Sequence, residues 1–126
     1  MIFITKKLDF CASHRLHNPE FSDEKNRETF GLCNNPNGHG HNYILEVTVC
    51  GEVADDTGMV LDLKALKELV QTRVINQVDH KNLNMDVPFL EGVIPSAENL
   101  AIKFWEALES HIERGRLYQI KLYESD

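Results

Sequence analysis

Three histidines are spaced so that they could bind one metal ion together. His39 and His41 are two residues apart, and side chains two residues apart on a β-strand point to the same side. Both share the parity of the apolar residues that follow, and His14 has the apolar parity of an earlier alternating segment. If the two segments pair antiparallel, the end of the first meets the start of the second. The three imidazoles are therefore expected at one end of a sheet, on its covered face.

Three neutral imidazoles with a fourth coordination position free are typical of a catalytic zinc ion, whereas a structural site closes with a fourth protein ligand. The sequence therefore predicts Zn²⁺ as cofactor, with His14, His39 and His41 as its ligands. His17, three residues beyond His14, is an alternative to it. His111 lies in a helical segment and is expected at the surface.

Two further features could supply acid–base chemistry. Cys33 lies six residues before His39 in a turn-rich segment, where a thiol close to zinc can act as a base or a nucleophile. It is alternatively a fourth zinc ligand or an ordinary loop cysteine. Asp79 and His80 are adjacent, and an acid–imidazole pair is the usual way to orient a base.

Glu124 ends the last strand-like segment with the parity of that segment's apolar residues. A carboxylate can accept two N–H donors at once, and the edge of an amino-pyrimidinone ring offers such a pair. Glu124 is therefore either a ligand-binding carboxylate or a solvated group at a strand end.

The elements that must position these residues follow from hydrophobic periodicity. Residues 2–14, about 41–53 and about 117–124 alternate as strands, and residues 59–61 are expected to be extended. Residues 79–82 form a polar segment between the helical and irregular parts of the chain.

Helices are expected between the second and third strands. Asp62 can cap one that reaches about Val74, and Ser96 opens another that Gly115 ends. A shorter helix is expected over 22–30. Two strands, two helices and a strand, in that order, predict an α+β fold with an antiparallel sheet and helices on one face.

Length and composition limit the class of protein. The 126 residues predict a single domain over 1–126, and the formal net charge of −7 argues against non-specific nucleic-acid binding. The absence of a signal peptide or long apolar run argues against membrane association. Three cysteines without a disulfide pattern favour a reducing, cytoplasmic setting. Cys11 and Cys50, on the strand parity opposite to the histidines, are expected to be packing residues.

The motifs resemble those of the 6-pyruvoyltetrahydropterin synthase and 6-carboxytetrahydropterin synthase family, and are closer to the pyruvoyl enzyme. The resemblance covers essentially the whole chain, in order and with matching spacing. Its segments are FCASHRL over residues 10–16, CNNPNGHGHNY over 33–43, TGMV over 57–60, DHKNL over 79–83 and YE over 123–124.

The resemblance implies conversion of 7,8-dihydroneopterin triphosphate to 6-pyruvoyl-tetrahydropterin with release of triphosphate, a carbon–oxygen lyase reaction. It implies zinc on the three histidines and Glu124 as the anchor of the pterin ring. Cys33 is implied as the proton-abstracting base, with Asp79 and His80 as partners that a neighbouring subunit often supplies. Substrate contacts are implied at Ser96 and Glu98, whereas Ala97 lacks the hydroxyl usual in the family. The candidate cations for the triphosphate are Arg15, Lys25, Arg27 and Lys81.

The resemblance also implies the tunnelling fold, in which three subunits close their sheets into a barrel and two trimers stack into a hexamer. A homo-oligomer with active sites at subunit interfaces is therefore expected. The family has a further strand after the segment matched here by Tyr123 and Glu124, and this sequence ends at Asp126. That final strand is therefore expected to be absent.

Two other functions remain open. 6-Carboxytetrahydropterin synthase, in the route to queuosine, shares the three histidines, the cysteine and the Asp–His pair. The five residues between Cys33 and His39 favour the pyruvoyl enzyme. A non-catalytic zinc-binding module would use Cys33 as fourth ligand, and it would leave Asp79, His80 and Glu124 without a role.

Overall fold

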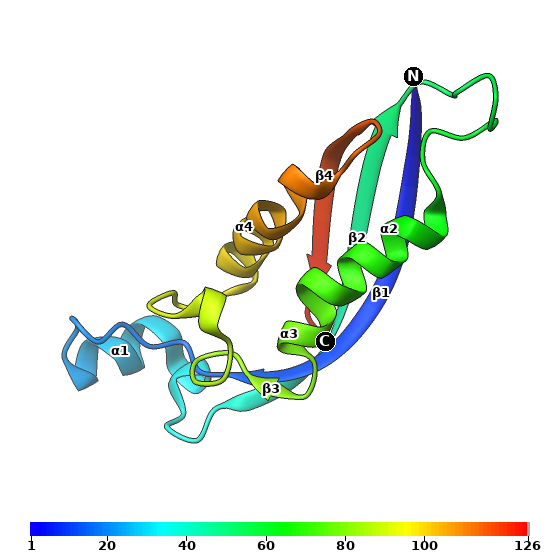
Figure 1. The fold of residues 1–126 in the computed structure, drawn as a ribbon. Coiled ribbons are helices and arrows are strands. Elements are labelled where there is room, and N and C mark those ends of the chain that lie inside the picture. The colour runs from blue at the N-terminus through cyan, green and yellow to red at the C-terminus, as the bar shows by residue number, and fades with distance from the viewer. Residues whose placement is uncertain (126) are drawn as a thin grey trace.

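The computed structural model describes residues 1–125, and its elements follow the predicted order with two short additions (Figure 1). In chain order they are β1 (Ile2–His14), α1 (Asp23–Phe30), β2 (His39–Gly51), α2 (Leu63–Val70), α3 (Asn76–Val78), β3 (Lys81–Asn82), α4 (Ala97–Leu108) and β4 (Arg116–Tyr123).

One sheet contains all four strands, in the order β3-β1-β2-β4. β1 and β2 pair antiparallel along their whole length, from Ile2 opposite Gly51 to His14 opposite His39. β4 pairs antiparallel with the other side of β2. The predicted α+β fold with its antiparallel strands is therefore confirmed. β3 adds a parallel pairing with β1 at only two positions, and a two-residue strand is too short to show an alternating pattern.

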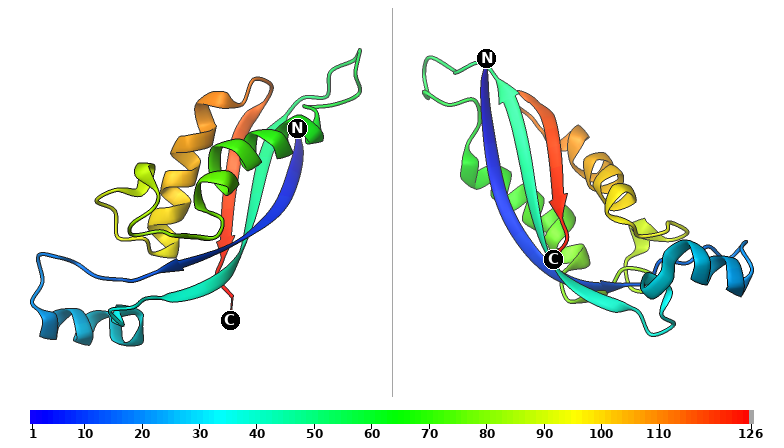
Figure 2. Two further views of the ribbon diagram at one scale, coloured as in Figure 1. Left: turned by 60° about the horizontal axis from the view of Figure 1, so that its bottom comes forward. Right: turned by 180° about the vertical axis from the view of Figure 1, so that it is seen from behind.

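The helical layer packs on one face of the sheet, with α2 and α4 side by side (Figures 1 and 2). Leu66 and Phe104 from these helices and Leu45 from β2 are completely buried, because the apolar stripes of both helices face the apolar parity of the strands. Asp62 and Ser96 cap the two helices as predicted: each side chain accepts a backbone N–H of the first turn, at 3.0 and 3.2 Å.

The helix ends differ from the predicted ones. α2 continues through a π-helical turn, Gln71–Ile75, directly into α3. α4 ends at Leu108, before the predicted stop at Gly115, and a short 3₁₀ turn, Glu109–His111, follows it. Over residues 1–125, no helix is both long enough and apolar enough to cross a membrane.

The connection between β1 and β2 lies at the end of the sheet where β1 ends and β2 begins (Figure 2). It contains α1, whose first turn is capped by the hydroxyl of Ser22 at 3.1 Å from the Lys25 nitrogen. The predicted short helix is therefore confirmed.

Two local predictions are wrong. Residues 59–61 are not extended throughout as expected, because the chain bends at Val60 and Leu61. Cys50 is completely buried in the central strand as predicted, but Cys11 is exposed. Cys11 points to the uncovered face of β1, where parity alone gives a side chain no packing partner. His111 is exposed as predicted.

Candidate metal centre and its surroundings

Strand pairing brings the three histidines together at one end of β1 and β2. His14 is the direct register partner of His39, and Ala12 is the partner of His41. The ring centroids are 4.7 Å apart for His14 and His39, 5.1 Å for His14 and His41, and 4.8 Å for His39 and His41. One potential ligand atom from each ring lies within 4.8 Å of the others. The cluster is therefore the one that strand parity predicts.

The protonation pattern of His14 follows from its contacts. Its Nδ1 lies 2.7 Å from the carbonyl oxygen of Pro95, and a carbonyl only accepts, so Nδ1 carries the proton and donates it. Burial, with the ring 1% exposed, lowers the pKa of His14 and favours the neutral form. Nε2 is then a buried, unprotonated acceptor that has no hydrogen-bond partner among residues 1–125. Such an atom costs about 1–3 kcal/mol unless a ligand satisfies it.

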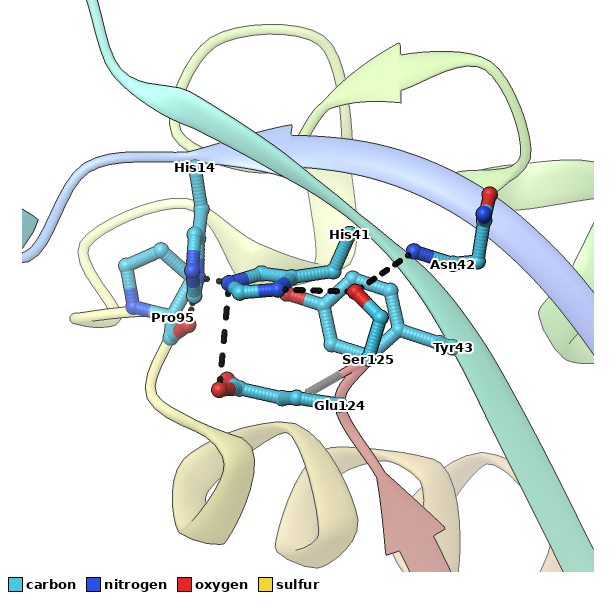
Figure 3. A network of polar contacts seen from close by, with 7 residues as sticks. All are labelled: His14, His41, Asn42, Tyr43, Pro95, Glu124 and Ser125. Carbon is cyan, nitrogen blue, oxygen red and sulfur yellow. Dashed lines mark hydrogen bonds and ion pairs between the residues drawn. The ribbon is translucent and has the colours of Figure 1, made fainter.

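His41 presents a second nitrogen of this kind (Figure 3). Its Nδ1 lies 3.2 Å from the hydroxyl of Ser125, and its buried Nε2 finds no hydrogen-bond partner in the part of the chain that the structure describes. Two unpartnered imidazole nitrogens and a third ring in one cluster are the donor set that Zn²⁺ prefers. The residues present therefore fit a zinc ion held by His14, His39 and His41.

Tyr43 packs against the rings of His14 and His41. Its side chain is fully buried, stacks on Phe10 with centroids 4.7 Å apart, and places its hydroxyl 3.4 Å from Nδ1 of His14. Burial raises the pKa of the Tyr43 hydroxyl, and the nearby charge of Glu124 adds to the effect. Tyr43 therefore stays protonated and supports the rings from below. Sequence reasoning missed this role, although Tyr43 has the same parity as His39 and His41.

Glycine is required at one position beside the cluster. Gly38 has a φ of 75°, and a Cβ added there would lie 3.0 Å from the backbone oxygen of His14. Only glycine adopts this backbone without strain. The close approach lets the chain turn directly from the connection into His39.

Gly38→Ala is expected to destabilise the fold by about 1–3 kcal/mol, because it combines left-handed strain with a clash against backbone. Gly40→Ala is the matched control: Gly40 has no positive φ, and its added Cβ would lie 3.5 Å from the Ala12 oxygen, an ordinary contact. Chemical denaturation of both variants measures the difference. Equal stabilities would contradict the role given to Gly38.

Cys33 lies in a 3₁₀ turn, Gly31–Asn34, that is fastened to the end of β1. The Cys33 carbonyl accepts the N–H of Leu16 at 2.8 Å, and the buried Asn34 amide donates to the Leu16 carbonyl at 2.8 Å. The Cys33 thiol is partly exposed and does not belong to the cluster of converging donor atoms. His17 is 3.0 Å from the Asn34 amide instead of joining the cluster. His14, and not His17, is thus the third histidine.

Asp79 and His80 are hydrogen-bonded to the edge of β1 that faces away from β2. The Asp79 carboxylate accepts the N–H of Cys11 at 2.9 Å, and the N–H of His80 donates to the Cys11 carbonyl. The Cys11 hydrogen bond, and then the neighbouring His80, lower the pKa of Asp79. Asp79 lies 3.0 Å from Nδ1 of His80, whose imidazole is 81% exposed. His80 also has a φ of 61°, a strain of about 1–3 kcal/mol that tends to be kept at functional positions.

The structure does not bring this pair to the histidine cluster within one chain. Over residues 1–125, no hydrogen bond or ion pair joins Asp79 or His80 to Cys33 or to the three histidines. The pair instead presents an oriented, solvent-exposed imidazole at the edge of the sheet.

The implied substrate-binding residues have different surroundings. Glu124 is 34% exposed, and its Oε2 lies 3.8 Å from Nε2 of His41, so it belongs to the cluster's surroundings. The hydroxyl of Ser96 is already engaged as the cap of α4. Glu98 lies in the first turn of α4.

Arg15 is the candidate cation best fixed near the cluster. Its Nε donates to the Asn34 carbonyl at 3.0 Å, and its backbone exchanges hydrogen bonds with the side chain of Asn84 at 2.7 and 2.9 Å. It lines a groove of about 490 Å³ together with Gly38. Lys25, in contrast, lies over the ring of Phe21 at 4.0 Å.

Known proteins are similar to this chain in both sequence and fold. The family model for 6-pyruvoyl tetrahydropterin synthase matches residues 3–126. The human protein named 6-pyruvoyl tetrahydrobiopterin synthase is 46% identical over 123 residues, which are 98% of this chain and 85% of that protein. A Rickettsia typhi protein named 6-carboxy-5,6,7,8-tetrahydropterin synthase is 34% identical, over 81% of this chain and 76% of that protein.

The fold comparison agrees with the sequence comparison. The solved structure of Caenorhabditis elegans 6-pyruvoyl tetrahydropterin synthase superimposes with a TM-score of 0.88 and 40% identity, over 99% of this chain and 96% of the other. The superposition therefore covers almost the whole chain. On this basis the chain belongs to the 6-pyruvoyl tetrahydropterin synthase family.

Proposed function

We propose that this chain is a zinc-dependent 6-pyruvoyl-tetrahydropterin synthase. It would convert 7,8-dihydroneopterin triphosphate to 6-pyruvoyl-tetrahydropterin with elimination of triphosphate. The proposal is carried by the convergence of two buried, unpartnered imidazole nitrogens, on His14 and His41, beside the carboxylate of Glu124. The name and 46% identity of the human relative support the pyruvoyl product over the carboxy product.

The chain's own residues would prepare the metal ligands and hold the pterin. Pro95 and Ser125 orient His14 and His41 so that their free nitrogens face one point. Zinc held by the three histidines would supply Lewis-acid chemistry, which makes C–H bonds next to a substrate oxygen more acidic. Glu124, about one-third exposed, is free to accept two N–H groups from the pterin edge. Glu98 would contribute a further polar contact, and Ser96 would do so only through the oxygen that already caps α4.

Cys33 would remove the proton from the activated carbon. Its thiolate forms the new S–H bond, triphosphate leaves with the electron pair of its C–O bond, and the redox change stays inside the substrate. The cysteine lies one short turn from the end of β1. Arg15, fixed beside the same turn, would pair with the triphosphate.

Asp79 and His80 would assist Cys33 from a second subunit. The pair is oriented and exposed on the edge of β1, and within one chain it contacts neither Cys33 nor the cluster. Within residues 1–125, β3 pairs with β1 at two positions and β4 pairs with β2 alone. Such open edges readily accept strands of another copy. We therefore propose a trimer or a dimer of trimers, in which each single-domain chain over 1–126 completes a neighbour's site. This assembly would account for the exposed Asp79–His80 pair and for the open strand edges.

The product of the reaction tests the proposal. Zinc-loaded protein is incubated with 7,8-dihydroneopterin triphosphate, and the products are identified by mass. We expect 6-pyruvoyl-tetrahydropterin and triphosphate, with turnover that a chelator removes and zinc restores. A carboxy-tetrahydropterin with acetaldehyde would establish the alternative activity. No product from protein that binds zinc would refute both enzymatic functions and favour a zinc-binding module.

A further inference from the structure

We infer that Ser125 is a positioning residue that sets the ring orientation and the tautomer of His41. The inference rests on the proposed zinc site and concerns how this chain prepares one ligand for it. Ser125 follows β4, whereas His41 lies on β2, so the contact joins two strands at the end of the sheet (Figure 3).

The hydroxyl of Ser125 has two polar neighbours. It accepts the backbone N–H of Asn42 at 3.2 Å, and it lies 3.2 Å from Nδ1 of His41. A serine oxygen has two lone pairs and one proton. The Asn42 N–H uses one lone pair, and the second remains for a proton on His41.

The surroundings of Nε2 decide which way that second hydrogen bond runs. If Nδ1–H of His41 donates to Ser125, Nε2 has a free lone pair directed into the cluster. If the serine O–H donated instead, neutral His41 would bury an N–H at Nε2. Over the described residues that atom has no hydrogen-bond partner, since the Glu124 oxygen at 3.8 Å is beyond hydrogen-bond distance. The first arrangement avoids burying an unpartnered N–H and leaves Nε2 with a lone pair that the proposed zinc ion could use.

The contact with Ser125 corresponds to the contact of His14 with Pro95. In both rings Nδ1 is held by an oxygen and Nε2 is left without a partner. For His14 the oxygen is a backbone carbonyl, which no side-chain substitution removes. For His41 it is a hydroxyl, so one substitution can test it. Outer partners of this kind set ligand tautomers in metal sites generally.

The neighbouring residue gives the contact a second consequence. Glu124 immediately precedes Ser125, and its carboxylate faces the same imidazole. A loss of the Ser125 contact therefore frees the backbone that carries the proposed pterin anchor. Zinc affinity and the KM for the pterin should change together.

The experiment compares Ser125→Ala, Ser125→Thr and Ser110→Ala in the full chain. Ser110 is exposed in the 3₁₀ turn after α4 and makes the matched control. Zinc affinity is measured by competition with a chromophoric chelator. Ser125→Ala is expected to weaken binding about 10–100-fold, as loss of an outer partner does elsewhere. Ser125→Thr, which keeps the hydroxyl, should stay close to the unaltered chain, and Ser110→Ala should not differ from it.

A second measurement tests the role of Ser125 in the unaltered protein, so it can be made even if the alanine variant folds poorly. Long-range ¹H–¹⁵N spectra of the unaltered, metal-free protein report the tautomer of each histidine. We expect His41 protonated at Nδ1, and a mixture of tautomers in Ser125→Ala. Protonation at Nε2 in the unaltered chain, or unchanged zinc affinity in Ser125→Ala, would overturn the role of Ser125 alone. Failure of the unaltered chain to bind zinc would overturn the proposed zinc site with it.

Discussion

Replacing His39 by alanine is expected to weaken zinc binding by more than about 100-fold and to reduce turnover to background. Loss of a residue that only supports a ligand already costs about 10–100-fold in affinity, and His39 is one of the three donors that converge within residues 1–125. The fold should survive, because the His39 ring is only partly buried. Chelator competition and circular dichroism measure the two properties on the same sample.

His111→Ala is the matched control for this substitution. His111 is exposed in the 3₁₀ turn Glu109–His111 and does not belong to the cluster, so its loss should leave zinc binding unchanged. His14→Ala should differ from His39→Ala by also destabilising the metal-free protein, because the His14 ring is almost completely buried and bonded to Pro95. Tight zinc binding by His39→Ala would show that the cluster is not the metal site.

Replacing Cys33 by alanine is expected to lower turnover by about 10²–10⁴-fold, the usual contribution of a positioned acid or base. Zinc affinity should stay close to that of the unaltered chain, since Cys33 is not among the converging donor atoms. The two readouts, kcat with dihydroneopterin triphosphate and the zinc dissociation constant, separate a base from a fourth ligand. The sequence alone leaves both roles open.

Cys11→Ala controls for the loss of a thiol, because Cys11 is exposed on β1 and only its backbone contacts Asp79. It should retain both zinc binding and turnover. Loss of zinc from Cys33→Ala would instead favour the fourth-ligand role and a structural site. Unchanged turnover would show that another group removes the proton.

Strand parity was sufficient to predict the histidine cluster because a strand has a period of two residues. The alternation of residues 2–14 ends on His14, and β2 begins on His39, so antiparallel pairing makes them direct partners. A shift of one residue would put their side chains on opposite faces. The helix caps at Asp62 and Ser96 could also be predicted from the sequence, because each is a hydrogen bond to a backbone N–H within three residues.

The missed features depend on contacts between distant parts of the chain. The carbonyl of Pro95 orients His14 from 81 residues away, and Ser125 reaches His41 across 84. A backbone carbonyl has no side-chain signature, and a serine next to Glu124 has no periodicity to reveal its partner. The exposure of Cys11 likewise depends on which face the helices leave uncovered. Over residues 1–125, no hydrogen bond or ion pair joins Asp79 or His80 to Cys33, so strand parity could not relate them.

The pairing of His14 with His39 also affects the connection between them. These two residues flank the 15–38 segment, so a metal ion bound to both would close that segment into a loop, as a cross-link does. Closing a loop removes configurations from the unfolded chain, and the entropy removed grows with loop length. The ion would thus restrict the conformations of the 15–38 segment, which carries Arg15 and Cys33. Metal binding and the ordering of this segment would then be coupled.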